Sequence, residues 1–238
     1  ATNIAFNAAK KFQQDGKKTS VAFFSLEMSS EQLSTRILAE QSRIKSNDIR
    51  RGRISEDQFD KFIESSKDNS ELPLYIDETP AISIAALSNR ARRMKRIYGL
   101  DLIVVDYIQL MTAVNSRRDG RVQEISEITQ GLKALAKELS VPVLALSQLS
   151  RAVEQRDDKQ PQLADLRESG SIEQDADLIA FIYRDELYNP DTPEKGKAEI
   201  IISKQRNGPI FSTVLTFIDK CTRFENFQPD IMRSEDFK

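Results

Sequence analysis

Histidine and tryptophan are absent from the 238 residues, which contain a single cysteine, Cys221, and only eight glycines. Without histidine the chain can form no Ser-His-Asp triad and supplies no histidine base or metal ligand. A single cysteine excludes an internal disulfide and a cysteine zinc cluster, and it is typical of a reducing cytosol. The glycine content is about half of the usual ~7%, so a glycine-rich phosphate loop has little material from which to form.

Neither sign of charge dominates, since 35 Lys and Arg residues balance 37 Asp and Glu residues to a formal net charge of -2. A polyanionic partner must therefore be bound by a local basic patch rather than by the overall charge. No apolar run reaches the ~18 residues that a membrane span requires, and the N-terminus has no signal-peptide pattern. We expect a cytoplasmic protein without a membrane partner.

Hydrophobic periodicity in the first 150 residues alternates between buried strands and amphipathic helices. The pattern predicts helices at 1–14, 55–67, 83–98 and 122–139, a helix that Ser30 caps and that ends near Ser42, and strands at 20–26, 74–76, 102–106 and 141–146. This alternation predicts an α/β fold, with a mainly parallel twisted sheet flanked by helices on both faces.

The remainder of the chain has a different pattern. Residues 150–175 are polar without clear periodicity, and they precede three apolar stretches at 178–183, 198–203 and 213–218. These stretches predict added antiparallel strands near the C-terminus, and the last dozen residues predict a loose polar tail.

Three polar residues follow successive predicted strands: Glu27, Asp106 and Gln148. In an open α/β sheet, ligands bind beyond the carboxyl ends of the strands. An aspartate there can hold Mg²⁺, often through water, while a neighbouring carboxylate can orient or deprotonate an attacking water. A glutamine can hydrogen-bond a terminal phosphate. Each residue alone is as well explained as a solvated strand end, but the joint pattern favours a nucleotide-hydrolase site.

Residues Gly16-Lys17-Lys18-Thr19 superficially match the end of a phosphate loop. The earlier glycine is missing, because position 11 is lysine, and the segment follows a helix and precedes a strand. That order is the reverse of what phosphate binding at a helix N-terminus requires. No GxxxxGK[ST] occurs elsewhere in the sequence.

Longer strings of the sequence are similar to one family. They are SLEMS at 25–29, IVVDYIQLM at 103–111, LKALAKEL at 132–139, ALSQL at 145–149, LRESGSIEQDAD at 166–177 and SKQRNGP at 203–209. In order and spacing they resemble the DnaB-type replicative DNA helicases over nearly the whole chain. The resemblance implies a RecA-like motor domain over residues 1–227, followed by the tail at 228–238.

The resemblance also implies an ATP-dependent DNA helicase that assembles as a homo-hexamer around single-stranded DNA and moves 5′ to 3′. By this resemblance Glu27 activates the hydrolytic water, Asp106 is the Walker B residue for Mg²⁺, and Gln148 senses the γ-phosphate of ATP. Lys204 and Arg206 resemble the pair that reaches the neighbouring subunit's nucleotide, with Arg206 as an arginine finger. Primase and a helicase loader are the partners expected of the full-length protein.

The segment 165–174 resembles the loop that contacts DNA in the central channel, and it contains Arg167, Glu168 and Gly170. Arginine can bind a phosphate, and glycine allows close approach of the backbone, so both suit contacts that carry no base information. Without the resemblance, a polar surface loop is the better explanation of this segment.

Two further assignments are weaker. Arg117, Arg118 and Arg121 form a second candidate channel loop, equally well explained as a solvated loop, and Arg223 and Phe224 are candidates for adenine contacts.

The sequence departs from the family pattern in two ways. It contains no counterpart of the N-terminal domain and linker helix, and it has no Walker A loop, which in the family precedes a helix like that predicted at 1–14. We therefore expect the chain to start just after that loop and to be inactive as an ATPase by itself. Two other interpretations stay open: a different RecA-like ATPase, such as a recombination type, and a catalytically silent ring or DNA-binding module.

Overall fold

The structure is a computed structural model that describes residues 1–113, 120–166 and 170–228. Four residues predicted to contact DNA, Arg117, Arg118, Arg167 and Glu168, lie outside the described residues, as does the predicted tail after residue 228. Within the described ranges, no helix combines the length and apolar character needed to cross a membrane.

The first half of the chain forms a four-stranded parallel sheet. Its strands are β1 (Val21–Ser25), β2 (Leu74–Asp77), β3 (Leu102–Asp106) and β4 (Val143–Ala145), in the order β2-β1-β3-β4. All five residues of β1 are buried, as expected of a strand covered on both faces. The predicted parallel sheet is confirmed, although β4 is shorter than the predicted strand at 141–146.

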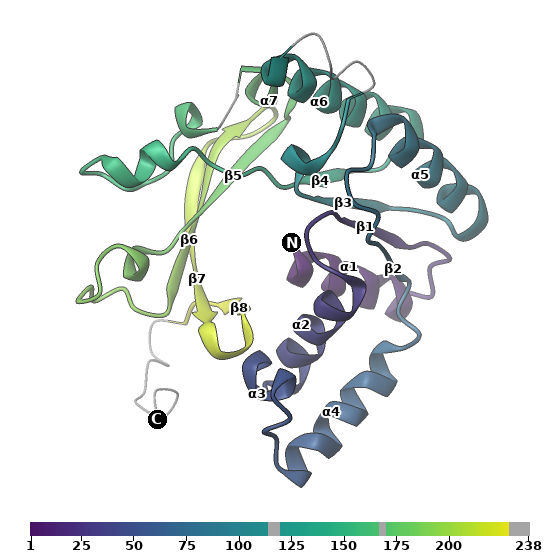
Figure 1. Cartoon of the computed structure of the whole chain (residues 1–238), viewed down its shortest axis with the longest axis vertical. Helices are drawn as coiled ribbons and strands as arrows, with labels where there is room; N and C mark the ends of the chain where they lie inside the picture. The colour runs from purple at the N-terminus through teal and green to yellow at the C-terminus, as the bar shows by residue number, and fades with distance from the viewer. Residues whose placement is uncertain (114–119, 167–169, 229–238) are drawn as a thin grey trace.

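Helices cover both faces of this sheet (Figure 1): α1 (Thr2–Gln14) and α2 (Ser30–Ser42) lie on one face, and α5 (Ile84–Tyr98) and α6 (Gly120–Leu139) lie on the other. Alternate side chains of a strand point to opposite faces. Phe23 accordingly packs with Ala5 and Leu33 of α1 and α2, whereas Phe24 belongs to the cluster that contains Leu87 and Ile125 of α5 and α6.

The start of α2 corrects one prediction. Ser29, not Ser30, is the N-cap: its side chain accepts a hydrogen bond from the Gln32 N–H, and the Gln32 side chain accepts one from the Ser29 N–H. This reciprocal capping box needs a glutamine or glutamate three residues after the cap, a spacing that Ser29 has and Ser30 lacks. The short helix α3 (Ser46–Arg50) was not predicted, and it precedes α4 (Glu56–Asn69).

The second half of the chain forms a separate antiparallel sheet in the order β5-β6-β7-β8. Its strands are β5 (Leu178–Tyr183), β6 (Lys197–Gln205), β7 (Phe211–Ile218) and β8 (Arg223–Asn226), of which β8 was not predicted. Buried Ile179 and Phe181 of β5 join the same hydrophobic cluster as Phe24 of β1. The two sheets are thus joined through one core.

Short helices connect these elements in the described part of the chain. They are η1 (Ile108–Leu110) after β3, η2 (Arg151–Gln155), η3 (Leu163–Asp165) and α7 (Gly170–Asp175) between the two sheets, and η4 (Asp185–Leu187) and η5 (Asp219–Cys221) within the antiparallel half. The regular structure in the described residues of the stretch at 150–175, for which no periodicity was found, is therefore limited to short helices and one β-bridge residue, Leu166.

Candidate nucleotide site

The carboxyl ends of β1 and β3 bring two acidic residues together. Ser25 is paired in register with Asp106, and the Leu26 N–H donates to the Asp106 carbonyl at 2.8 Å. The chain then turns, with Ser25 Oγ donating to the Met28 carbonyl at 2.7 Å. This turn presents Glu27 at the same edge of the sheet as Asp106.

Gln148 completes the group from the end of β4. Glu27, Asp106 and Gln148 line one pocket of about 260 Å³, together with Tyr107, Leu146 and Ser147. The structure therefore places in one pocket the three residues that were singled out at the ends of successive strands. Another pocket, of about 350 Å³, lies at the β2 edge and includes none of the three.

The Asp106 carboxyl is half-buried, and its neighbours offset little of the cost of burying its negative charge. Burial raises its pKa above the usual value, and the negative charge of Glu27 adds to this shift, while Arg36 opposes it. Among the described residues, no group donates a hydrogen bond to this carboxylate. A cation between Asp106 and Glu27 would relieve both the burial and the repulsion.

The oxygen donors of this pocket fit Mg²⁺, which is bound in proteins by one or two carboxylates together with water and phosphate oxygens. No group of three or more acidic or thiol side chains with metal-binding geometry occurs in the described ranges. Asp106, with Glu27 beside it, is therefore the residue that would hold the ion, and the remaining ligands must come from water and the nucleotide.

Gln109 holds the backbone that carries Gln148, a role that the sequence did not reveal. Its Nε2 donates to Ser147 Oγ at 2.8 Å and to the Gln148 carbonyl at 3.4 Å, while its Oε1 accepts from the Gln148 N–H at 3.2 Å. Gln109 is located on η1, directly after β3. The available signal was a lone amide among apolar residues in the string IVVDYIQLM, three residues after Asp106.

Arg121, from the predicted second channel loop, is bound to this same arrangement. It lies near the start of α6, where it forms an ion pair with Glu124 at 2.7 Å and donates to the Gln109 carbonyl. The structure thus links Arg121 to the support of Gln148.

Lys204 and Arg206 lie elsewhere, at the end of β6 and just beyond it. Lys204 Nζ donates to the Glu173 carbonyl, and Arg206 Nη2 donates to the Gln174 carbonyl at 3.3 Å, so both cations contact the backbone of α7. Arg206 also pairs with Asp177 at 3.4 Å, and its side chain is 53% exposed. Neither residue lines the pocket that contains Glu27, Asp106 and Gln148.

The remaining predicted contacts are placed as follows. Gly170 is the first residue of α7, and a Cβ at that position would meet no atom within 4 Å. Phe224 packs its ring against Phe217, with the centroids 4.9 Å apart, and its N–H donates to Asn3 Oδ1 at 3.1 Å. Arg223 donates to the Glu40 carbonyl at 3.2 Å, so these candidate adenine contacts lie near α1 and α2.

A parallel sheet with helices on both faces, acidic residues at its carboxyl edge and an added antiparallel sheet defines a RecA-like α/β ATPase fold. Two solved structures share it. A structure described as a DnaB-like replicative helicase and its interactions with primase matches 94% of this chain and 53% of its own, with a TM-score of 0.87 and 35% identity. A second structure, described as an ATPase domain, matches 95% of this chain and 80% of its own, with a TM-score of 0.88 and 35% identity.

The chain belongs to the family of the DnaB-like helicase C terminal domain, which matches residues 1–226. It is 47% identical over 228 residues to the replicative DNA helicase DnaB of Geobacillus stearothermophilus, covering 96% of this chain and 49% of the relative. It is 50% identical over 231 residues to DnaB of Buchnera aphidicola subsp. Schizaphis graminum, covering 95% and 48%. The chain spans about half the length of these curated relatives.

Proposed function

We propose that this chain is the motor domain of a replicative DNA helicase, which couples ATP hydrolysis to 5′-to-3′ movement on single-stranded DNA. The observation that carries the proposal is the pocket of about 260 Å³ shared by Glu27, Asp106 and Gln148. It lies at the carboxyl edge of the parallel sheet, where ligands bind in this class of fold. The family membership of residues 1–226 supports the same activity.

In this proposal each pocket residue has a separate task. Bound Mg²⁺ would neutralise charge on the phosphates of ATP. Asp106 holds the ion, Glu27 orients the attacking water and accepts its proton, and Gln148 hydrogen-bonds the terminal phosphate. Glu27 suits its task because its side chain is exposed and lines the pocket in which a water can enter.

Lys204 and Arg206 complete the site of a neighbouring subunit in a homo-hexameric ring. The support is their placement: both are held on the carbonyls of α7 and lie outside the pocket of their own chain. An arginine that stabilises transition-state charge is commonly supplied by a partner subunit.

DNA binding is proposed for the segment around α7, where open space surrounds Gly170. Arg167, Glu168, Arg117 and Arg118 stay predictions as DNA contacts. Primase and a helicase loader are proposed partners of the full-length protein, for which the relative whose description includes primase gives support. A cytoplasmic location is proposed from the role of the relatives as replicative DNA helicases.

The test is the ATPase rate of the full-length protein with and without single-stranded DNA, followed by unwinding of duplexes with a 5′ or a 3′ tail. We expect DNA-stimulated hydrolysis and unwinding that starts from the 5′ tail. Hydrolysis without unwinding would favour another RecA-like ATPase, and absence of hydrolysis would leave only a silent ring or DNA-binding module. A polypeptide of residues 1–238 alone, which contains no GxxxxGK[ST], is expected to hydrolyse ATP far more slowly.

A further inference from the structure

The stretch between β4 and α7 is closed at its base by backbone contacts. Leu149 forms an antiparallel bridge with Leu166, and the Ser150 N–H donates to the Asp165 carbonyl at 2.8 Å. We refer to residues 149–166 as the clamp loop. It begins one residue after Gln148 and ends one residue before Arg167. Its base therefore joins the nucleotide pocket to the segment predicted to contact DNA.

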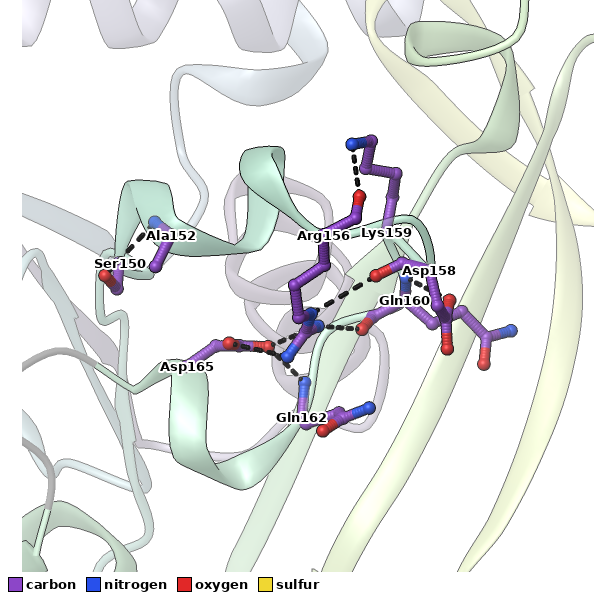
Figure 2. Close-up of polar contacts among 8 residues, drawn as sticks. All are labelled: Ser150, Ala152, Arg156, Asp158, Lys159, Gln160, Gln162 and Asp165. Atoms are coloured by element: carbon purple, nitrogen blue, oxygen red, sulfur yellow. Dashed lines mark hydrogen bonds and ion pairs between the residues drawn. The ribbon is translucent and has the colours of Figure 1, made fainter.

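An ion pair between Arg156 and the buried Asp165 side chain crosses the clamp loop, as Figure 2 shows. Arg156 Nη1 donates to Asp165 Oδ1 at 3.0 Å, and Arg156 Nη2 donates to Asp165 Oδ2 at 2.9 Å. The Asp165 side chain is 6% exposed and also accepts from the Gln162 N–H at 2.8 Å. Two parallel hydrogen bonds to one carboxylate require the planar guanidinium, so lysine is not an equivalent here.

The same guanidinium holds the outer part of the loop. Arg156 Nη2 donates to the Gln160 carbonyl at 2.7 Å, and Nε donates to the Asp158 carbonyl at 3.2 Å (Figure 2). Lys159 Nζ in turn donates to the carbonyls of Glu154, at 2.8 Å, and Arg156. Among the described residues of the clamp loop, Arg156 is thus the one side chain that contacts both the outer turn and, through Asp165, the base.

Gln148 is held on two sides as a result. On one side Gln109 binds its N–H and its carbonyl. On the other side the next residue, Leu149, is paired with Leu166, whose position depends on Asp165 and hence on Arg156. Removing the guanidinium would leave a buried carboxylate with one backbone donor, and the base of the loop would loosen to hydrate it.

We propose that Arg156 and Asp165 are positioning residues that keep Leu149, the residue after Gln148, paired with Leu166, so that the nucleotide pocket and the DNA-contacting segment change together. The inference rests on the proposed function and extends it. The pair touches neither nucleotide nor DNA: it keeps two backbone segments paired, and this pairing transmits the state of one ligand to the other.

The experiment uses the full-length protein with ATP and an oligothymidylate as the single strand. The quantity measured is the ratio of the DNA-stimulated to the unstimulated ATPase rate, well below the melting temperature of each variant. We expect Arg156→Met and Asp165→Asn each to lower this ratio about tenfold, which is within the usual range of coupling between two ligands. Arg156→Lys keeps one charge contact and is expected to have an intermediate ratio.

Arg184→Met is the matched control, because Arg184 forms a comparably buried ion pair with Glu186 in the antiparallel half, at 2.5 Å, and its other side-chain contacts are with Asp219 and Phe217 rather than with the clamp loop. We expect it to lower the melting temperature but leave the ratio unchanged. Clamp variants that lower both rates in proportion, or a control that lowers the ratio equally, would show a merely structural role and overturn the inference. If the unaltered protein itself shows no DNA stimulation, the proposed function fails first.

Discussion

At the carboxyl edge of the parallel sheet, Glu27 and Asp106 share a pocket whose described lining contains no lysine or arginine. At the end of β6, Lys204 and Arg206 rest on helix carbonyls and line no part of that pocket. The lining of the first region has acidic groups and no lysine or arginine, whereas the second region has two cations that donate to backbone carbonyls. Phosphoryl transfer needs both kinds of group around one phosphate. Under the proposed function, the comparison teaches that one copy of this chain holds both halves of a site but does not bring them together.

The largest expected effect is on the ATPase rate of an Arg206 variant, which tests whether the two regions meet at the interface between subunits. Arg206→Ala in the full-length protein should lower the ATPase rate by roughly 10³–10⁵-fold while nucleotide binding is retained, because the guanidinium stabilises charge that develops only in the transition state. The measurement is the ATPase rate of Arg206→Ala mixed with Glu27→Gln. Each variant alone is inactive, but a mixed ring contains interfaces with an intact Glu27 on one side and an intact Arg206 on the other.

Recovery of activity on mixing is therefore the expected result, and its absence would show that both residues act within one chain. Arg93→Ala is the control, since Arg93 is an exposed arginine of α5 that lines neither of the two pockets described above. It should change the rate little, either alone or in the mixture.

The second largest expected effect is on the ATPase rate when Glu27, one of the two acidic residues of the pocket, is changed. Glu27→Gln removes the group that accepts a proton from water, and we expect the ATPase rate to fall by about 10²–10⁴-fold. Binding of a fluorescent ATP analogue, measured by titration, should change little. Glu31→Gln is the control on the neighbouring helix, and a loss as large as that of Glu27→Gln would contradict the assigned role.

A smaller fall in the ATPase rate is expected when the hydrogen bonds that hold the backbone of Gln148 are removed. Gln109→Ala removes hydrogen bonds to Ser147 and Gln148, each contributing on the order of 1 kcal/mol, so we expect roughly a tenfold fall in ATPase rate. Gln123→Ala, on the exposed side of α6, should leave the rate unchanged. A Gln109→Ala protein with the normal rate would show that Gln148 needs no such support.

The smallest effect is on stability and follows from the raised pKa of Asp106. A raised pKa means that the folded protein binds the proton more tightly than the unfolded chain, so ionisation lowers stability as pH rises through that pKa. Asp106→Asn should therefore melt about 2–4 °C higher than the unaltered protein at pH 7, without nucleotide. The difference should vanish well below the usual carboxyl pKa of about 4, where the Asp106 carboxyl is protonated in both the folded and the unfolded chain. Equal melting temperatures at pH 7 would mean that neighbouring groups fully offset the cost of burying the Asp106 carboxylate.

Much of the parallel half was predictable from the sequence because its signals are local. A strand buried on both faces is apolar throughout, so the polar residue that ends it is conspicuous, as with Glu27 after β1 and Asp106 in β3. Their proximity followed from the shared edge of parallel strands. The separate antiparallel sheet was also indicated by three apolar runs, whereas β8, with the sequence RFEN, has no such pattern.

The supports of the site were not predictable, because they depend on register between distant segments. Gln109 meets Ser147 and Gln148 across 38 and 39 residues, and the short helix η1 that orients it has no periodicity to detect. Arg156 and Asp165 are only nine residues apart, yet they lie in a stretch without regular structure. The shift of the α2 cap from Ser30 to Ser29 had a different cause, since two adjacent serines compete and only the capping-box spacing decides.

The shared hydrophobic cluster has a mechanical consequence. Ile179 and Phe181 of the antiparallel sheet pack in the same core as Phe24 and Val105 of the parallel sheet, and closely packed interiors compress little and transmit strain. A displacement of the parallel sheet at the proposed nucleotide pocket would therefore be passed to β5 and its partner β6 instead of being absorbed between the sheets. Because Lys204 is paired in register with Ile179 of that core, the two cations lie at the end of β6 nearest the parallel sheet and would shift with it.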